Sequence, residues 1–305
     1  MAWRTLMIQN AARLSLNKGQ VLLQNNDGDY TFPLEDIAAI LLESPQVSLT
    51  SSLLAKCQDG GVPLITCDDT HIPNGVLLPF LPHSRQSKIA RMQIAWSEPF
   101  KKRLWQRVVQ TKISNQAKCL KTCKGAEIAT RIFALSKLVE SGDVGNVEAQ
   151  AAREYWTRLF GDDFRRDGYG SINAALNYGY AVLRAFVARS QVAYGLLPTF
   201  GIHHDNELNA FNLTDDMMEV FRPLADRRIF IMQKEGQFSE DGNLSKENRA
   251  HLAALANELC VIDGDKHNVM NAADKMAAGL VTAIEGKSAA LIPLPEFIVG
   301  NDVGE

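Results

Sequence analysis

Two carboxylate segments and a pair of histidines are the parts of the sequence whose residue types could hold a metal ion. Glu148 begins a helical pattern in which the neighbours at i+3 and i+4 are Ala151 and Ala152. Those side chains are small enough to let another helix approach the face that carries Glu148. The alternative is that a glutamate in a first helical turn only complements the helix dipole. Glu148 is therefore a candidate ligand, with that alternative open.

The adjacent histidines His203 and His204 follow a long helical pattern, in a segment typical of a loop. Loops held by rigid elements often carry functional side chains. A histidine taken alone, however, more often hydrogen-bonds a neighbour than binds a metal. The pair is thus a candidate only in combination with other ligands.

Asp216 and Glu219 form the third candidate segment. On one helix over 214–233 they would lie on the same face, and Asp215 would suit the N-cap. The alternatives are a helix-dipole role for Asp216 and an ion pair between Glu219 and Arg222. If the three segments meet in the fold, carboxylate, imidazole and carboxylate could clamp a divalent ion beside a phosphate.

Positive charge is concentrated in one block of the chain. The net charge of the 305 residues is −3, yet residues 81–125 carry eleven Lys and Arg side chains against the single acid Glu98. Such a local excess focuses a positive field and favours a polyanionic partner. Trp96 and Trp105 are interleaved with these charges, which is typical either of a binding groove or of a core. A solvated helix face is the alternative.

Composition places the chain among globular proteins of a reducing compartment. Hydrophobic residues make up 46% and charged residues 22%, which is ordinary for a globular domain. Five cysteines without a dense framework indicate free thiols, and the spacing of Cys119 and Cys123 does not fit a zinc site. Neither a spanning apolar stretch nor a secretory signal is recognisable, so we expect a cytoplasmic protein.

The hydrophobic pattern changes its period near residues 80–85. Before that point it predicts a meander of three short strands, followed by further strands and one short helix, at 13–16, 20–24, 30–32, 37–42, 51–58 (the helix) and 62–67. After it, helices are predicted at 86–96, 99–123, 126–139, 146–160, 171–194, 214–233, 245–261 and 265–285. We therefore expect an α+β fold with an N-terminal β-rich domain over 1–82, a larger all-α domain over 83–287, and a tail over 288–305 that is extended or mobile.

Five segments together resemble a known family. They are Pro33–Ile37 with Leu49–Ser51, Val147–Ala152, Asn173–Tyr180, Gly201–His204 and Asp216–Pro223. In order and separation they are similar to the CRISPR-associated endonuclease and integrase family, here called the Cas-one family. The resemblance covers the chain to about residue 285 and is greatest to the shorter members, from systems with a single-protein RNA-guided effector.

This resemblance implies a catalytic metal site. Glu148, His204 and Glu219 would be the catalytic residues and the ligands of Mg²⁺ or Mn²⁺, with Asp216 in a supporting role. The doubled histidine makes His203 a competitor for the imidazole position, and the spacing from the preceding glycine selects His204.

The resemblance also implies a DNA reaction and partners. Family members pair as homodimers through their β-domains, bind double-stranded and branched DNA, and work with a small ferredoxin-like partner that bridges two dimers. They insert short duplexes into a CRISPR array by attack of a 3′-hydroxyl on a phosphodiester. We expect phosphate contacts from Arg85, Lys101, Lys102, Arg103, Arg107, Arg165 and Arg166. The alternatives are a hydrolytic nuclease of branched DNA and a non-catalytic DNA-binding scaffold, and no membrane partner is expected.

Overall fold

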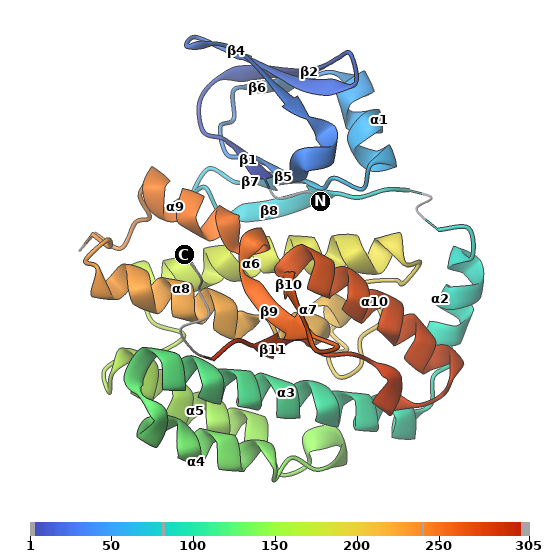
Figure 1. Ribbon diagram of the computed structural model, residues 1–305, viewed down its shortest axis with the longest axis vertical. Coiled ribbons are helices and arrows are strands. Elements are labelled where there is room, and N and C mark those ends of the chain that lie inside the picture. Colours follow the sequence, from blue (N-terminus) through green and yellow to red (C-terminus); the bar gives the residue numbers. More distant parts are fainter. Residues whose placement is uncertain (1–3, 81–82, 240, 300–305) are drawn as a thin grey trace.

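A strand-rich unit sits on a larger helical unit in the computed structural model, which describes residues 4–80, 83–239 and 241–299 (Figure 1). The first unit is built from the first part of the chain, and the helices follow it from α2 onward. The predicted α+β order, with strands first and helices after, is therefore confirmed.

The N-terminal unit contains two four-stranded sheets and one helix. Its elements are β1 (Arg4–Ile8), β2 (Ala12–Asn17), β3 (Gln20–Asn25), β4 (Gly28–Pro33), β5 (Ile37–Leu42), β6 (Val47–Leu49), α1 (Ser51–Asp59), β7 (Leu64–Cys67) and β8 (Pro73–Leu77). The strand orders are β1-β5-β7-β8 and β4-β3-β2-β6. The predicted meander is β2, β3 and β4, paired antiparallel. Lys18 and Gly19 turn its first hairpin with φ of 50° and 79°, as a two-residue hairpin turn requires.

Strand β5 links the two units because both of its faces are covered. Ile37 and Ile40 belong to the core of the strand-rich unit, whereas Ala39 and Leu41 pack into the core of the helices. A continuous apolar run is the pattern of such a doubly buried strand. The strand-rich unit therefore shares part of its core with the helical unit.

The helical unit is organised around two long helices. Its helices are α2 (Gln86–Ile94), α3 (Glu98–Lys124), α4 (Ala126–Ser136), α5 (Val147–Phe160), α6 (Ser171–Ala193), α7 (Asn212–Met218), α8 (Arg222–Lys234), α9 (Lys246–Ala253) and α10 (Val269–Glu285). Short 3-10 segments lie at 34–36, 141–143, 254–257 and 289–291. Helix α3 packs on α4, α5 and α8, while α6 packs on α7, α8, α9 and α10.

The single helix predicted over 214–233 is wrong, because the chain breaks between α7 and α8. Pro223 stands in the first turn of α8. A proline ring lacks an N–H and clashes with the carbonyl four residues before it, which here belongs to Glu219. Helix α7 accordingly ends at Met218, and Glu219 is its C-cap residue.

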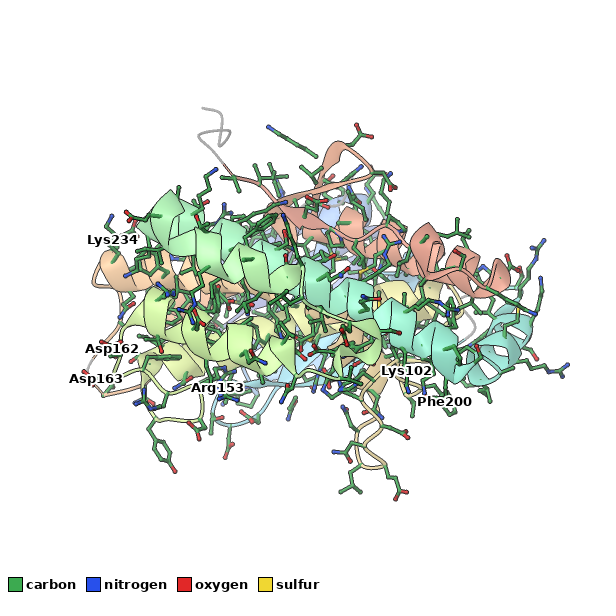
Figure 2. The ribbon with its side chains drawn as sticks, turned by 90° about the horizontal axis from the view of Figure 1, so that it is seen from below. Lys102, Arg153, Asp162, Asp163, Phe200 and Lys234 are labelled. Atoms are coloured by element: carbon green, nitrogen blue, oxygen red, sulfur yellow. The ribbon has the colours of Figure 1, made fainter. Side chains whose placement is uncertain are left out.

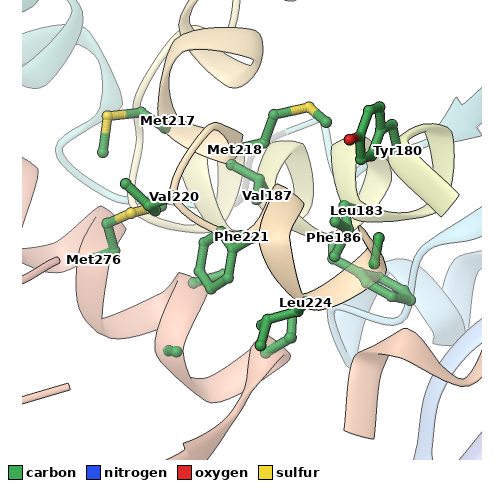
Figure 3. Packing of buried hydrophobic residues seen from close by; sticks show 14 of the residues in the cluster. Tyr180, Leu183, Phe186, Val187, Met217, Met218, Val220, Phe221, Leu224 and Met276 are labelled. Atoms are coloured by element: carbon green, nitrogen blue, oxygen red, sulfur yellow. The ribbon is translucent and has the colours of Figure 1, made fainter. Parts of the chain in front are cut away.

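Packing of apolar side chains holds this break in place. Figure 3 shows Met217 and Val220 on one side of the α7–α8 segment and Phe221 and Leu224 between neighbouring helices. All four are at most 2% exposed. The packing of these apolar side chains thus holds the backbone between α7 and α8 in place, and with it the polar side chains of this segment.

The helical unit also contains a small sheet, so the all-α expectation is wrong in this part. Strands β9 (Leu259–Ile262), β10 (Asp265–Asn268) and β11 (Glu296–Phe297) lie in the order β10-β9-β11. Strand β9 replaces the end of the helix predicted over 245–261, and β10 replaces the start of the helix predicted over 265–285. Asp263 and Gly264 turn the hairpin with φ of 53° and 86°, and Asp-Gly is a strong hairpin signal that the helical periodicity obscured.

The described part of the C-terminal tail is tied to the helices. Arg107 donates to the carbonyls of Ala289 and Ile292 at 2.9 and 3.1 Å. The Asn115 side chain donates to Pro295 O and accepts from the Phe297 N–H, both at 2.9 Å. Residues 288–299 are therefore anchored rather than mobile, and residues 300–305 of the predicted tail lie outside the described residues. Within the described residues, no helix is long and apolar enough to span a bilayer.

Candidate metal centre

Glu148 projects from the first turn of α5, but it is not the residue that satisfies the start of that helix. The Asp143 carboxylate accepts the N–H groups of Val147 and Glu148 at 2.9 and 3.0 Å. Asn146 enters the helix in the left-handed region, with φ of 49°. Because Asp143 supplies the capping acceptor, the Glu148 side chain is left to point elsewhere.

The Glu148 side chain meets a lysine in the middle of α3. Nζ of Lys112 lies 2.5 Å from Oε1 of Glu148 and 2.6 Å from Oε2 of Glu219. The lysine side chain is only 12% exposed. Burial alone would lower the pKa of Lys112, but the charges of Glu219 and Glu148 outweigh it and raise that pKa. Two carboxylates far apart in the sequence therefore converge on one cation.

Glu219 is buried and is held by a second cation. Nε of Arg222 lies 3.0 Å from Oε1 of Glu219, which is the ion pair that the sequence allowed as an alternative role. The Arg222 guanidinium in turn lies over the Tyr180 ring, 4.4 Å from its centroid. Burial opposes ionisation of Glu219, yet Arg222 and Lys112 bring its pKa below the ordinary value. The carboxylate therefore stays charged inside the protein.

Asp216 organises the loop that carries the histidines. It is completely buried, and its Oδ2 accepts the N–H groups of Ile202 and His203 at 2.6 and 2.9 Å. Its Oδ1 accepts from the His204 N–H at 3.2 Å and lies 2.5 Å from Nδ1 of the same residue. A role limited to the helix dipole is therefore excluded for Asp216. Asp215, predicted as an N-cap, lies inside α7 instead and pairs with Arg184.

This contact fixes the orientation of the His204 ring. With Nδ1 held by a carboxylate, Nε2 is the nitrogen left for another partner, as in histidines that bind metals. The hydrogen bond to Asp216 is the main reason why the pKa of His204 lies above its ordinary value. The charge of His204 also contributes to lowering the pKa of Glu219, after the larger effects of Arg222 and Lys112.

His203 has a different environment from His204. Its ring stacks on the buried Trp105, with centroids 4.4 Å apart and an interplanar angle of 3°. His204 meets the same indole edge-on at 6.0 Å. The stacked ring packs the loop against α3, whereas the contact with Asp216 orients the His204 ring, and this difference favours His204 as the metal ligand. Which histidine binds a metal stays a prediction.

The residues brought together suit a hard divalent ion, although they are arranged around Lys112. No group of three or more His, Cys, Asp or Glu side chains in the described ranges is close enough to hold a metal as it stands. However, Oε2 of buried Glu219 makes no hydrogen bond with proper geometry, and two carboxylates with one imidazole match Mg²⁺ or Mn²⁺. The donor set therefore fits the ion that the sequence predicted.

Comparison with known proteins identifies the family. A family model described as "CRISPR associated protein Cas1" matches residues 6–260. The chain is 41% identical over 298 residues to the CRISPR-associated endonuclease Cas1 of Neisseria meningitidis serogroup C, covering 98% of this chain and 97% of that protein. The chain belongs to the Cas1 family. A Pyrobaculum aerophilum CRISPR-associated endonuclease Cas1 is 27% identical over 262 residues, with 81% of this chain and 88% of that protein covered.

Solved structures show the same fold. A casposase bound to integration product has a TM-score of 0.74 at 18% identity and covers 93% of this Cas1 chain and 91% of that chain. A Cas1 protein from Thermotoga maritima has a TM-score of 0.71 at 18% identity, with 94% and 97% covered. A chain of a Cas6-RT-Cas1–Cas2 complex matches at 0.72 and 19% identity; all but 1% of the Cas1 chain aligns, over 36% of that longer chain.

The basic residues predicted to contact DNA do not all present free charges. Lys102, Arg103 and Arg85 are exposed, whereas Lys101 pairs with Glu98 at 3.0 Å. The guanidinium of Arg107 is engaged by the carbonyls of the C-terminal segment, and burial lowers its pKa. Arg107 therefore has a structural role that charge counting could not distinguish from phosphate binding.

Arg165 and Arg166 lie in the loop between α5 and α6. Arg165 is exposed, and its guanidinium donates to carbonyls of its own loop. Arg166 donates to the side chains of Asn173 and Asn177 at 3.2 and 2.8 Å. Figure 2 labels Lys102 and Asp162, a residue of this loop, well apart along the length of the helical unit. Contact of these arginines with DNA stays a prediction.

Lys112 is the site residue that sequence reasoning did not single out. In the sequence it is one of the eleven Lys and Arg side chains of the basic block over 81–125. Its neighbours on α3, however, include Val108, Val109 and Ile113, all completely buried. A lysine on the buried face of a helix requires a buried acidic partner, so its position within the apolar pattern is the signal that could have identified it.

The cysteines form no centre of their own. Among the described residues all five are free thiols, as predicted. Sγ of buried Cys119 lies 3.4 Å from the Tyr155 hydroxyl, so this residue is part of the core between α3 and α5.

Proposed function

We propose that this Cas1 chain is a divalent-metal-dependent DNA integrase and endonuclease. The observation that carries the proposal is the convergence of the Glu148 and Glu219 carboxylates on Nζ of Lys112, together with the contact by which Asp216 orients His204. Relatives named CRISPR-associated endonuclease Cas1, and a casposase bound to integration product, support a reaction on DNA.

In this proposal Glu148, Glu219 and His204 would hold Mg²⁺ or Mn²⁺. When bound, the ion would supply charge neutralisation at the scissile phosphate and activation of the attacking oxygen. Asp216 keeps the imidazole oriented, and Arg222 keeps Glu219 ionised. The exposed cations of α3, Lys102 and Arg103 among them, neutralise backbone phosphates and position the DNA.

The proposed reaction is transesterification. The 3′-hydroxyl of a short incoming duplex attacks a phosphodiester of the CRISPR array, one phosphodiester bond forms as another breaks, and the displaced 3′-oxygen takes up a proton. Because the bonds exchanged are alike, no nucleotide cofactor is required. Attack by water in the same site would give hydrolysis of branched DNA instead.

The proposal includes two partners and a compartment. We propose that the chain acts in the cytoplasm as a homodimer joined through its strand-rich units. A small ferredoxin-like protein would bridge two dimers. Structures in which a Cas1 chain forms a complex with Cas2 support this assembly.

A joining assay tests the proposed function against its alternatives. The purified chain, with its partner, is incubated with a 3′-hydroxyl duplex and a supercoiled plasmid that carries the repeat, in Mn²⁺, in Mg²⁺ or in EDTA. Joined product in either metal supports an integrase, and nicking without joining supports the hydrolytic nuclease. DNA binding with neither reaction supports the scaffold.

The Glu148→Ala variant provides the control for the site. It should lose joining while it retains most DNA binding, because one carboxylate contributes little to a broad phosphate contact. Glu127→Ala, at an exposed position on α4, should retain both. Equal joining by Glu148→Ala and wild type would overturn the proposed site.

A further inference from the structure

The Lys112 ammonium occupies the place between the two carboxylates where a bound ion would have to sit. It contacts Oε1 of Glu148 and Oε2 of Glu219 at 2.5 and 2.6 Å. A divalent ion that joined these two residues through the same oxygens would need to replace the ammonium. The two cations therefore compete for one position.

We propose that Lys112 is a resident cation that a divalent ion must displace, and that it thereby sets the metal affinity of the site. The inference rests on the proposed function, because it takes Glu148 and Glu219 to be metal ligands. It assigns to Lys112 a positioning role: it holds the two carboxylates together in the metal-free protein and weakens metal binding by the cost of its displacement.

The charge balance around the pair supports displacement. Two carboxylates, Glu148 and Glu219, face two cations, Lys112 and Arg222, in the protein without metal. Adding a divalent ion while both cations stay in contact would leave a net charge of about +2 in a largely buried site, which is electrostatically costly. Because Arg222 is stacked on Tyr180, Lys112 is the cation that can leave.

The position of Lys112 on α3 allows it to move without unfolding. Its neighbours Val109 and Ile113 are completely buried, so the helix backbone is fixed. The flexible four-carbon side chain nevertheless lets the ammonium move to another position by a change of rotamer. Once displaced, the charge remains tethered beside the metal site, where it can contact a phosphate oxygen.

Without Lys112 most of the negative charge of the Glu148 and Glu219 carboxylates would be left without a neighbouring positive charge. Arg222 contacts Oε1 of Glu219 only, and Glu148 has no other ion pair in the described residues. Like charges in a poorly solvated site repel each other. Removing the lysine charge should thus destabilise the metal-free protein and strengthen its attraction for a divalent ion.

Direct Mn²⁺ titration tests the proposal without any DNA or activity. Free Mn²⁺ is measured by electron paramagnetic resonance for the full-length wild type and for Lys112→Met, and the unfolding midpoint of each is measured in EDTA. We expect Lys112→Met to bind Mn²⁺ at least roughly tenfold more tightly and to unfold at a lower temperature in EDTA. Equal or weaker Mn²⁺ affinity in the variant would overturn the proposal.

Two matched variants separate charge from packing. Lys112→Arg keeps the positive charge and should keep the weaker affinity of the wild type. Lys121→Met removes an exposed lysine from the same helix and should leave Mn²⁺ affinity unchanged. Tighter binding in Lys112→Arg or in Lys121→Met would contradict a displaced cation at position 112.

A labelling experiment on the wild type keeps the proposal testable if the variants do not fold. Lysine amines are modified with an acylating reagent in EDTA and in saturating Mn²⁺, and the sites are mapped by mass spectrometry. Lys112 should react faster in Mn²⁺, with Lys121 as the unchanged reference, and an equal rate for Lys112 would overturn displacement. If Mn²⁺ binds neither the wild type nor any variant, the proposed metal site itself fails, and this inference with it.

Discussion

Glu148 and Glu219 contact the same atom, Nζ of Lys112, although one lies in the first turn of α5 and the other is the C-cap residue of α7. Neither element could place its carboxylate there alone. Helix α3 packs on α5, α7 and α8. The site therefore forms only because these three helices all pack against α3, which carries Lys112.

The two histidines should differ in their importance. His204→Ala removes the ring that Asp216 orients and should lower joining by more than about 100-fold. His203→Ala removes a ring that stacks on Trp105 and should cost mainly loop stability. Joining rates and unfolding midpoints of both variants, measured side by side, check this ranking. The reverse ranking would reassign the imidazole ligand to His203.

Gly201→Ala should disturb the histidine loop for a purely steric reason. A Cβ at this position would lie 2.1 Å from the His204 carbonyl oxygen and 2.9 Å from Oδ2 of Asp216. We expect a loss of about 1–3 kcal/mol in unfolding free energy together with loss of joining. Gly145→Ala is the matched control, because its Cβ would meet only Val147, at 3.5 Å. Urea unfolding of both variants decides the comparison.

The exposed end of α3 should contribute to the salt dependence of DNA binding. Replacing Lys101, Lys102 and Arg103 together with alanine should reduce the slope of log K against log salt by up to about 3. The control replaces Lys18 and Lys56 in the strand-rich unit. Titrations of a labelled duplex at several salt concentrations measure the slope, and an unchanged slope in the triple variant would remove this segment from the DNA path.

Asp226 should make stability depend on pH. Burial raises its pKa from 3.8 to about 7, against the opposing hydrogen bonds from Tyr180 and Tyr155. Between those values the unfolded chain is the more ionised state, so it binds fewer protons than the folded one. The free energy of unfolding therefore falls as pH rises through this window, by up to about 1.4 kcal/mol per unit.

The variant Asp226→Asn should flatten this part of the pH profile. Chemical unfolding at several values between pH 4 and about 7 measures it. Asp59→Asn, at an exposed position on α1, should keep the slope of the wild type. A slope that persists in Asp226→Asn would assign the pH dependence to other groups.

Local signals in the sequence were sufficient for much of the fold. Two turn segments between short strands predicted the meander, a continuous apolar run predicted β5, and the period of 3.6 predicted α3, α5 and α6 nearly to their ends. These features depend on neighbours a few residues away, which periodicity reports directly. The Asp263–Gly264 hairpin and the break at Pro223 also had local signals, but the apolar periodicity around them favoured longer helices.

The sequence by itself determined which residue types were available: three carboxylates, two histidines and a basic block. The tertiary structure alone decided which of them meet. In the fold, Lys112 contacts both Glu148 and Glu219. Asp216 binds His204 in the histidine loop, and Arg107 donates to a carbonyl of the C-terminal segment. The physical reason is that these ion pairs and hydrogen bonds join helices and loops that are far apart in the sequence. The residue pattern of one helix does not indicate which side chains of another element pack against it.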